Sequence, residues 1–119
     1  MKKYKYLFLV KNGNPEFRCD YVELHMDLLS DKELTGCATN GGGEFKFDFD
    51  NKEIILFGRS CDYGRPREIE NTIQKCYDQI LDAVDDFWWR YTETDYNFKD
   101  FKIAYLDDYK EKHVVKKKK

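Results

Sequence analysis

Six apolar residues in the second half of the chain recur at steps of four, three, four, four and three. Because an α-helix has about 3.6 residues per turn, this spacing places their side chains on one helical face. Pro66 suits the first turn of that helix. The six residues are Ile69, Ile73, Cys76, Ile80, Val84 and Phe87. They predict one long helix of about five or six turns, whose apolar face requires a partner surface.

The residues before this helix predict the surface on which it packs. Phe45, Phe47 and Phe49 alternate with charged residues, which is typical of a half-buried antiparallel strand. The turn at 50–52 leads into a second strand, and the two strands form a hairpin. Because residues 54–57 are continuously apolar, this second strand is expected to be central and covered on both faces.

Shorter elements are predicted on either side. The helical spacing of Val22, Met26 and Leu29 indicates a short helix over residues 21–29, with Asp20 as its N-cap. Further strands are expected at residues 4–10, 16–19 and 98–106, and a loop is expected at 34–43. The chain therefore predicts an α+β fold, a mostly antiparallel mixed sheet with one short and one long helix packed on it.

Length and composition favour a single small domain. The chain has 119 residues, of which 41% are apolar and 37% are charged. One domain is expected over residues 1–109, followed by a charged tail over 110–119. The four lysines that end the tail are expected to be solvated, and weak contact with an acidic partner is the alternative.

Charge and cysteine pattern narrow the classes of partner. A net charge of −2 provides no general attraction to nucleic acid or to a membrane. The apolar stretch at 6–10 is too short for a signal peptide, so a cytoplasmic protein is expected. The four cysteines form no C-x-x-C pair and are expected to be free thiols in a reducing compartment. Neither a metal nor another cofactor is predicted.

The loop from Ser60 to Gly64 is a candidate anion site. It joins the apolar strand to the predicted helix, and the free N–H groups at such a junction can hold phosphate or carboxylate. Arginines 59, 65 and 67 crowd the same stretch. The alternative is that Ser60 caps the helix and the arginines are solvated.

His25 is the second candidate. It is one of two histidines, and imidazole is the side chain that titrates near neutrality without special help. A histidine on a short helix can be structural or catalytic. Lys5 on the first strand and Arg18, seven residues before His25, are the cations that could join it at a phosphate site.

These stretches resemble the Janus/Ocnus-type phosphohistidine phosphatases. The run GGGEF followed by NKEIILFGRSCDYG is similar to the family's triple-glycine strand, second strand and anion loop. Upstream, YKYLFLV resembles the family's first strand, and FRCDYVELH resembles its segment from a phosphate-binding arginine to the catalytic histidine. The resemblance extends over about residues 4–73 and also suits the expected fold.

The resemblance implies a role for six residues. His25 would be catalytic, and Lys5, Arg18, Ser60, Cys61 and Asp62 would bind phosphate. The sequence departs from the family's pattern at two of its positions. Glu44 stands where the family has a phosphate-contacting arginine, and Asp62 stands where it has a small neutral residue.

Two functions follow from these observations. The first is a metal-independent phosphatase that acts on phosphohistidine or another phosphoramidate, in a phosphorylated protein or a small ligand. The second is a non-catalytic binding module of the same fold that holds an anionic or phosphorylated ligand or a protein partner. A monomer or a weak dimer is expected, with Trp88 and Trp89 as the possible dimer contact.

Overall fold

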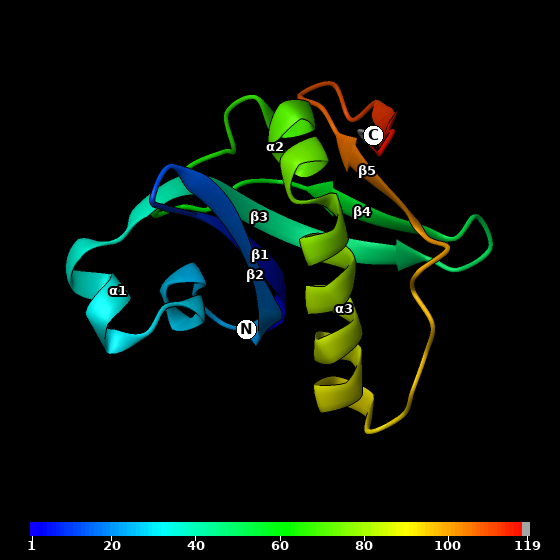
Figure 1. Ribbon diagram of the computed structural model, residues 1–119, viewed down its shortest axis with the longest axis horizontal. Helices are drawn as coiled ribbons and strands as arrows, with labels where there is room; N and C mark the ends of the chain where they lie inside the picture. Colours follow the sequence, from blue (N-terminus) through cyan, green and yellow to red (C-terminus); the bar gives the residue numbers. More distant parts are fainter. Residues whose placement is uncertain (118–119) are drawn as a thin grey trace.

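A six-stranded mixed sheet with the strand order β2-β1-β3-β4-β5-β6 organises the computed structural model, which describes residues 1–117 (Figure 1). The strands are β1 (Lys3–Lys11), β2 (Asn14–Val22), β3 (Ala38–Asp48), β4 (Glu53–Phe57), β5 (Lys102–Leu106) and β6 (Lys112–Val115). The helices are the 3₁₀ helix η1 (His25–Leu28), α1 (Asp31–Gly36), α2 (Ile69–Lys75) and α3 (Tyr77–Thr92). All strand pairings within 1–117 are antiparallel except that of β4 with β5, so the predicted α+β fold is confirmed.

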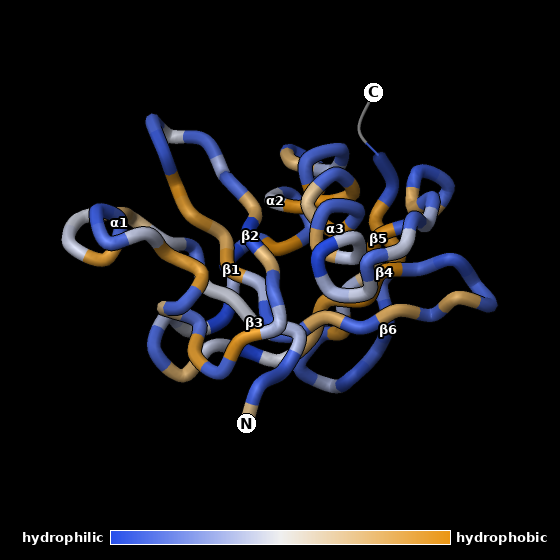
Figure 2. Tube along the Cα trace, turned by 90° about the horizontal axis from the view of Figure 1, so that it is seen from below, coloured by the Kyte–Doolittle hydropathy of each residue, from blue (hydrophilic) through white to orange (hydrophobic). Residues whose placement is uncertain are grey.

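Alternate residues of β1 face two separate cores. Tyr6 and Phe8 belong to the main core, which the apolar residues of α2 and α3 complete. Leu7 and Leu9 pack with Leu28 of η1 in a smaller core on the opposite face. Figure 1 shows α3 lying across the sheet and α1 at a distance from α3, with β1 and β2 between them. In Figure 2 the hydrophobic stretches lie toward the middle of the molecule, and the outer loops are hydrophilic.

The long helix is present but broken. All six apolar residues of the predicted face lie in the main core or pack against it. Cys76 leaves the helical conformation with φ −121° and ψ 29°, so the helix divides into α2 and α3 rather than running on as predicted. It begins at Ile69, three residues after the buried Pro66. No helix in the described part of the chain has both the length and the apolar character needed to cross a bilayer.

The connection between β4 and β5 is a crossover through α2 and α3. β5 runs parallel to β4, with Ile54 opposite Ile103, and this arrangement requires a long connection. The last strand was expected to begin at Phe98, but it begins at Lys102. Phe98 and Phe101 are instead buried in the main core, and the segment that contains them lies before the strand and has no regular structure.

The prediction for residues 21–29 was wrong. β2 continues through Val22, which pairs with Lys3, so Asp20 lies in a strand and caps no helix. Only a 3₁₀ turn follows, and the α-helix begins after Ser30. Ser30 and Glu33 cap that helix reciprocally, each side chain accepting from the other's backbone N–H.

Two segments expected to lack regular structure belong to elements. The region predicted as a loop, 34–43, holds the end of α1 and the first residues of β3. The predicted tail contributes β6, which pairs with β5 through Val115 opposite Ile103. Apolar Val115 is buried by this pairing, and burying it favours a strand over a solvated tail. The last two lysines lie outside the described residues.

The end of α3 is aromatic. Trp88 packs edge-on against Phe47 and lies close to Phe98. Trp89 is 52% exposed. Trp89 is the more exposed of the two tryptophans, and the dimer contact stays a prediction.

Candidate functional site

His25 is the first residue of η1 and is buried, with 5% of its surface exposed. Leu28 anchors η1 in the smaller core, which holds the histidine against the sheet. The Nε2 atom lies 2.8 Å from the backbone oxygen of Gly43 in β3. Sequence patterns identified His25 but not this acceptor, because a backbone carbonyl has no side-chain signature.

The hydrogen bond decides which ring nitrogen is available. A carbonyl oxygen can only accept, so Nε2 carries the hydrogen and Nδ1 is left with a lone pair in the neutral ring. Burial lowers the pKa of His25, the Gly43 hydrogen bond raises it, and Lys5 lowers it again. Because the net shift is downward, the imidazole is neutral near pH 7 and can accept a proton through Nδ1.

Two charged residues of the predicted site, Lys5 and Asp62, lie near His25, and so does Glu44. Lys5 of β1 lies opposite Glu44 of β3 in the strand register, and both charges act on the pKa of His25. Asp62 acts on it as well, in the same direction as Glu44. Lys5 Nζ donates to the Glu23 carbonyl, which directs the ammonium group beside η1. The fold therefore brings Lys5, His25 and Asp62 together, with Glu44 among them.

The three glycines before Glu44 allow this convergence. A Cβ on Gly42 would lie 2.3 Å from the backbone oxygen of Tyr6, and one on Gly43 would lie 2.4 Å from that of Phe57. Gly41 has φ +73° and lies against the backbone of Arg65. The glycine run is thus explained by close packing of backbones on both sides of β3.

The Ser60–Gly64 turn packs on the same glycines. Ser60 and Gly64 form a two-residue bridge, and the Gly64 carbonyl accepts from the Gly42 N–H at 3.0 Å. Ser60 is buried and its Oγ accepts from the Tyr63 N–H, so its first role is to close the turn. The exposed Cys61 and Asp62 have backbone N–H groups with no acceptor in the described part of the chain.

The sequence suggested that the Ser60–Gly64 turn leads directly into a helix N-terminus, and the structure shows that it does not. Helix α2 begins only at Ile69, and the residue before it, Glu68, is in the left-handed conformation. Any attraction of the turn for an anion therefore comes from its own N–H groups and not from a helix dipole.

Arg18 lies apart from the other predicted phosphate ligands. Its guanidinium makes two hydrogen bonds to Glu33 and two to Glu16, and a further one to the Leu28 carbonyl. The Glu33 hydrogen bonds are the main reason that the pKa of Arg18 is raised. Its donors are occupied, so Arg18 serves in this structure to fasten α1 to β2.

Replacing Arg18 with glutamine is expected to lower the free energy of unfolding by about 1–3 kcal/mol. The reason is that the mostly buried Glu33 carboxylate would then have a single cation, Lys11. Urea unfolding at neutral pH measures this. Hydrogen bonds from Arg18, then Lys11, hold the pKa of Glu33 below its usual 4.5, so the loss should shrink as the pH falls below about 4.5. Arg59→Gln, at an exposed position, is the control.

One further cluster could in principle hold a metal. Ligand atoms of Asp107, Glu111 and His113 lie within 4.8 Å of one another. Asp107 and His113 already share a hydrogen bond of 2.8 Å, which explains their proximity without an ion. The cluster lies on the β5–β6 side of the sheet, and the expectation of no metal stays a prediction.

Comparison with known proteins adds nothing to these observations. No protein-family model matches the chain, and a search of curated proteins finds no significant match. The family resemblance therefore rests on the motif residues alone.

Proposed function

We propose that this protein is a metal-independent phosphatase-like protein that acts on phosphohistidine or a related phosphoramidate. The observation that carries the proposal is a buried, neutral His25 next to Lys5 and the Ser60–Gly64 turn. Within residues 1–117, its Nδ1 and the Cys61 and Asp62 N–H groups have no hydrogen-bond partner. A base with a lone pair beside cationic and N–H donors is the arrangement needed for attack on a phosphoryl group.

In the proposed reaction, Lys5 and the Cys61 and Asp62 N–H groups bind the phosphoryl oxygens. His25 Nδ1 takes a proton from water as the water oxygen forms a bond to phosphorus. The P–N bond breaks, its electron pair stays with the leaving nitrogen, and that nitrogen takes up a proton from solvent. Because this bond is labile, positioning and charge stabilisation supply most of the rate.

The surroundings of His25 favour a protein substrate. Leu24 and Met26 flank the histidine in sequence, and 46% and 38% of their surfaces are exposed. Exposed apolar side chains beside a reactive group suit contact with a polypeptide better than contact with a small, fully hydrated phosphate ester.

The direct test is hydrolysis of a phosphohistidine peptide by the purified protein, with a phosphoserine peptide of the same sequence as the comparison. We expect release of phosphate from the first peptide only. If neither peptide is hydrolysed at any pH between about 5 and 9, the catalytic proposal is rejected.

The alternative is a binding module with the same site and no turnover. Glu44 and Asp62 place two carboxylates near His25, and Arg18 is occupied elsewhere, so the site holds fewer free cations than the resemblance implies. In this case phosphate or a phosphopeptide raises the melting temperature of the protein, Lys5→Ala abolishes the rise, and no phosphate is released.

Replacing Glu44 with glutamine is expected to tighten phosphate binding about fivefold. A carboxylate some 5 Å from a bound phosphate opposes it by on the order of 1 kcal/mol, and the amide removes that repulsion. Titration calorimetry at low ionic strength measures the change. Glu93→Gln, at the end of α3 on the other face of the sheet, is the control and should leave the affinity as it is. Equal affinities for all three proteins would place the phosphate elsewhere.

A further inference from the structure

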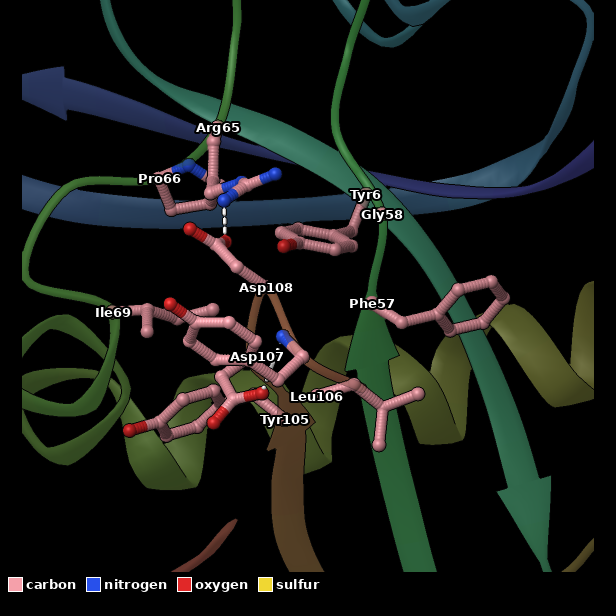
Figure 3. A pocket seen from close by; sticks show the side chains of 11 residues that line it. Tyr6, Phe57, Gly58, Arg65, Pro66, Ile69, Tyr105, Leu106, Asp107 and Asp108 are labelled. Atoms are coloured by element: carbon pink, nitrogen blue, oxygen red, sulfur yellow. Dashed lines mark hydrogen bonds and ion pairs between the residues drawn. The ribbon is translucent and has the colours of Figure 1, made fainter. Parts of the chain in front are cut away.

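A cavity lies where the parallel strands β4 and β5 end. Its volume is about 240 Å³, and the strand ends, the loop before α2 and the loop after β5 surround it (Figure 3). The carboxyl ends of parallel strands joined by a helical crossover are a common place for small ligands in α/β arrangements. Position alone does not make a site, so the argument depends on the groups that line the cavity.

The Tyr6 hydroxyl is the first of these groups. Tyr6 is 1% exposed as a whole residue, and no hydrogen bond to its hydroxyl is found within residues 1–117. Figure 3 shows the hydroxyl pointing into the cavity, where its oxygen is accessible. Because the hydroxyl opens onto the cavity, it can pair either with water or with a ligand there. Burial raises the pKa of Tyr6, so the hydroxyl is protonated and can donate.

Arg65 provides the second group. Its guanidinium pairs with Asp108 at the rim, and it is close enough to Tyr6 to act on the pKa of that hydroxyl. The side chains of Arg65 and Asp108 are 48% and 65% exposed, and an ion pair so exposed adds little stability. A ligand carboxylate can therefore replace Asp108 on Arg65, and Asp108 can turn to water.

The remaining carboxylate at the cavity is already satisfied. Asp107 accepts from His113 Nε2 at 2.8 Å and from the backbone N–H groups of Tyr109 and Glu111. The His113 hydrogen bond is the main reason that the pKa of Asp107 is lowered. Asp107 therefore needs no cation from a ligand. The two groups left to recognise a ligand are the Tyr6 hydroxyl and Arg65, whose exposed pair with Asp108 can be exchanged.

The walls are apolar. Phe57, Pro66, Ile69 and Tyr105 contribute rings and aliphatic groups. The volume is below the range usual for drug-sized ligands and suits one ring or one branched aliphatic chain.

We propose that this cavity binds a small monocarboxylate with an aromatic or branched aliphatic body. The carboxylate accepts a hydrogen bond from the Tyr6 hydroxyl and pairs with Arg65 in place of Asp108. The apolar body lies against Phe57, Pro66 and Tyr105.

This site is separate from the one at His25. Tyr6 and Lys5 are neighbours in β1, so their side chains point to opposite faces of the sheet. The proposal therefore does not depend on phosphatase activity, and a variant at His25 should leave it unaffected.

Phenylacetate is the probe for the test, and amide chemical shifts of the full chain are the readout. Phenylacetate is expected to shift the amides of Gly58, Tyr105 and Tyr109, with a Kd of about 1 mM for so small a ligand. Phenylacetamide and phenethylamine match its shape without the carboxylate, and inorganic phosphate has no apolar body. Binding by any of these three as tight as that of phenylacetate, or no shift with phenylacetate at about 10 mM, would overturn the proposal.

Two variants locate the contacts. Tyr6→Phe should weaken phenylacetate binding about three- to tenfold, and Arg65→Gln about tenfold or more. Tyr6→Phe removes a hydroxyl that opens onto the cavity and keeps the buried ring, so it is expected to melt close to the temperature of the wild type. Arg67→Gln and His25→Gln are the controls, and both should bind like the wild type. Unchanged affinity in both Tyr6→Phe and Arg65→Gln would place the ligand elsewhere.

Discussion

A protein carrying His25→Ala is expected to hydrolyse a phosphohistidine peptide about 100-fold more slowly than the wild type, or slower still. His25 supplies the neutral imidazole lone pair to which the proposed reaction assigns the proton of water, so its removal takes away that base. The measurement is the initial rate of phosphate release with excess peptide.

Two variants separate the loss of the base from damage to the fold. His25→Gln keeps an N–H donor that can reach the Gly43 carbonyl but has no basic nitrogen, so it should be folded and equally slow. His113→Ala removes the other histidine, which pairs with Asp107 on the far side of the sheet, and should retain the wild-type rate. A His25→Gln protein as fast as the wild type would rule out His25 as base or nucleophile.

The pH profile offers a further check on the state of His25. Because burial lowers its pKa below 6.5, the rate is expected to hold from about pH 7 down to 6.5 and to fall only at lower pH. The unfolded chain takes up this proton more readily than the folded one, so stability also falls as the pH drops below 6.5. His25→Gln should lack this part of the stability loss.

Gly42→Ala is expected to lower the free energy of unfolding by about 3 kcal/mol or more. The added Cβ would lie 2.3 Å from the Tyr6 carbonyl oxygen, and a strand backbone cannot move aside as a flexible side chain can. Urea unfolding followed by circular dichroism measures the loss. If the variant folds, the His25 site should also be displaced, because the Cβ would lie 3.1 Å from the His25 ring.

Gly36→Ala is the matched control for this prediction. Gly36 ends α1, and a Cβ there meets no atom within 4 Å. Alanine is favoured over glycine in helices, so the stability of Gly36→Ala should be equal to or slightly above that of the wild type. If Gly42→Ala were as stable as Gly36→Ala, β1 and β3 could not approach as closely as the structure has them.

The candidate site was only partly visible in the sequence. The glycine run and the Ser60–Gly64 turn marked one part, and His25 with Lys5 marked another. The structure brings these parts together around Gly43, but it also pairs Arg18 with Glu33, fifteen residues away. The sequence spacing of Arg18 and His25 did not predict this, because the partner of an arginine depends on which carboxylate the fold brings within reach.

The sequence alone determined the elements in which buried residues recur at a regular spacing. The apolar face from Ile69 to Phe87 and the hairpin around residues 50–52 were predictable because each follows from the geometry of one helix or one turn. Tertiary structure decided the break at Cys76, the parallel β5 and the strand β6. It also decided the proton position on His25 and the placement of the Tyr6 hydroxyl at the cavity. These features depend on contacts between residues far apart in sequence, which no local pattern of residue types encodes.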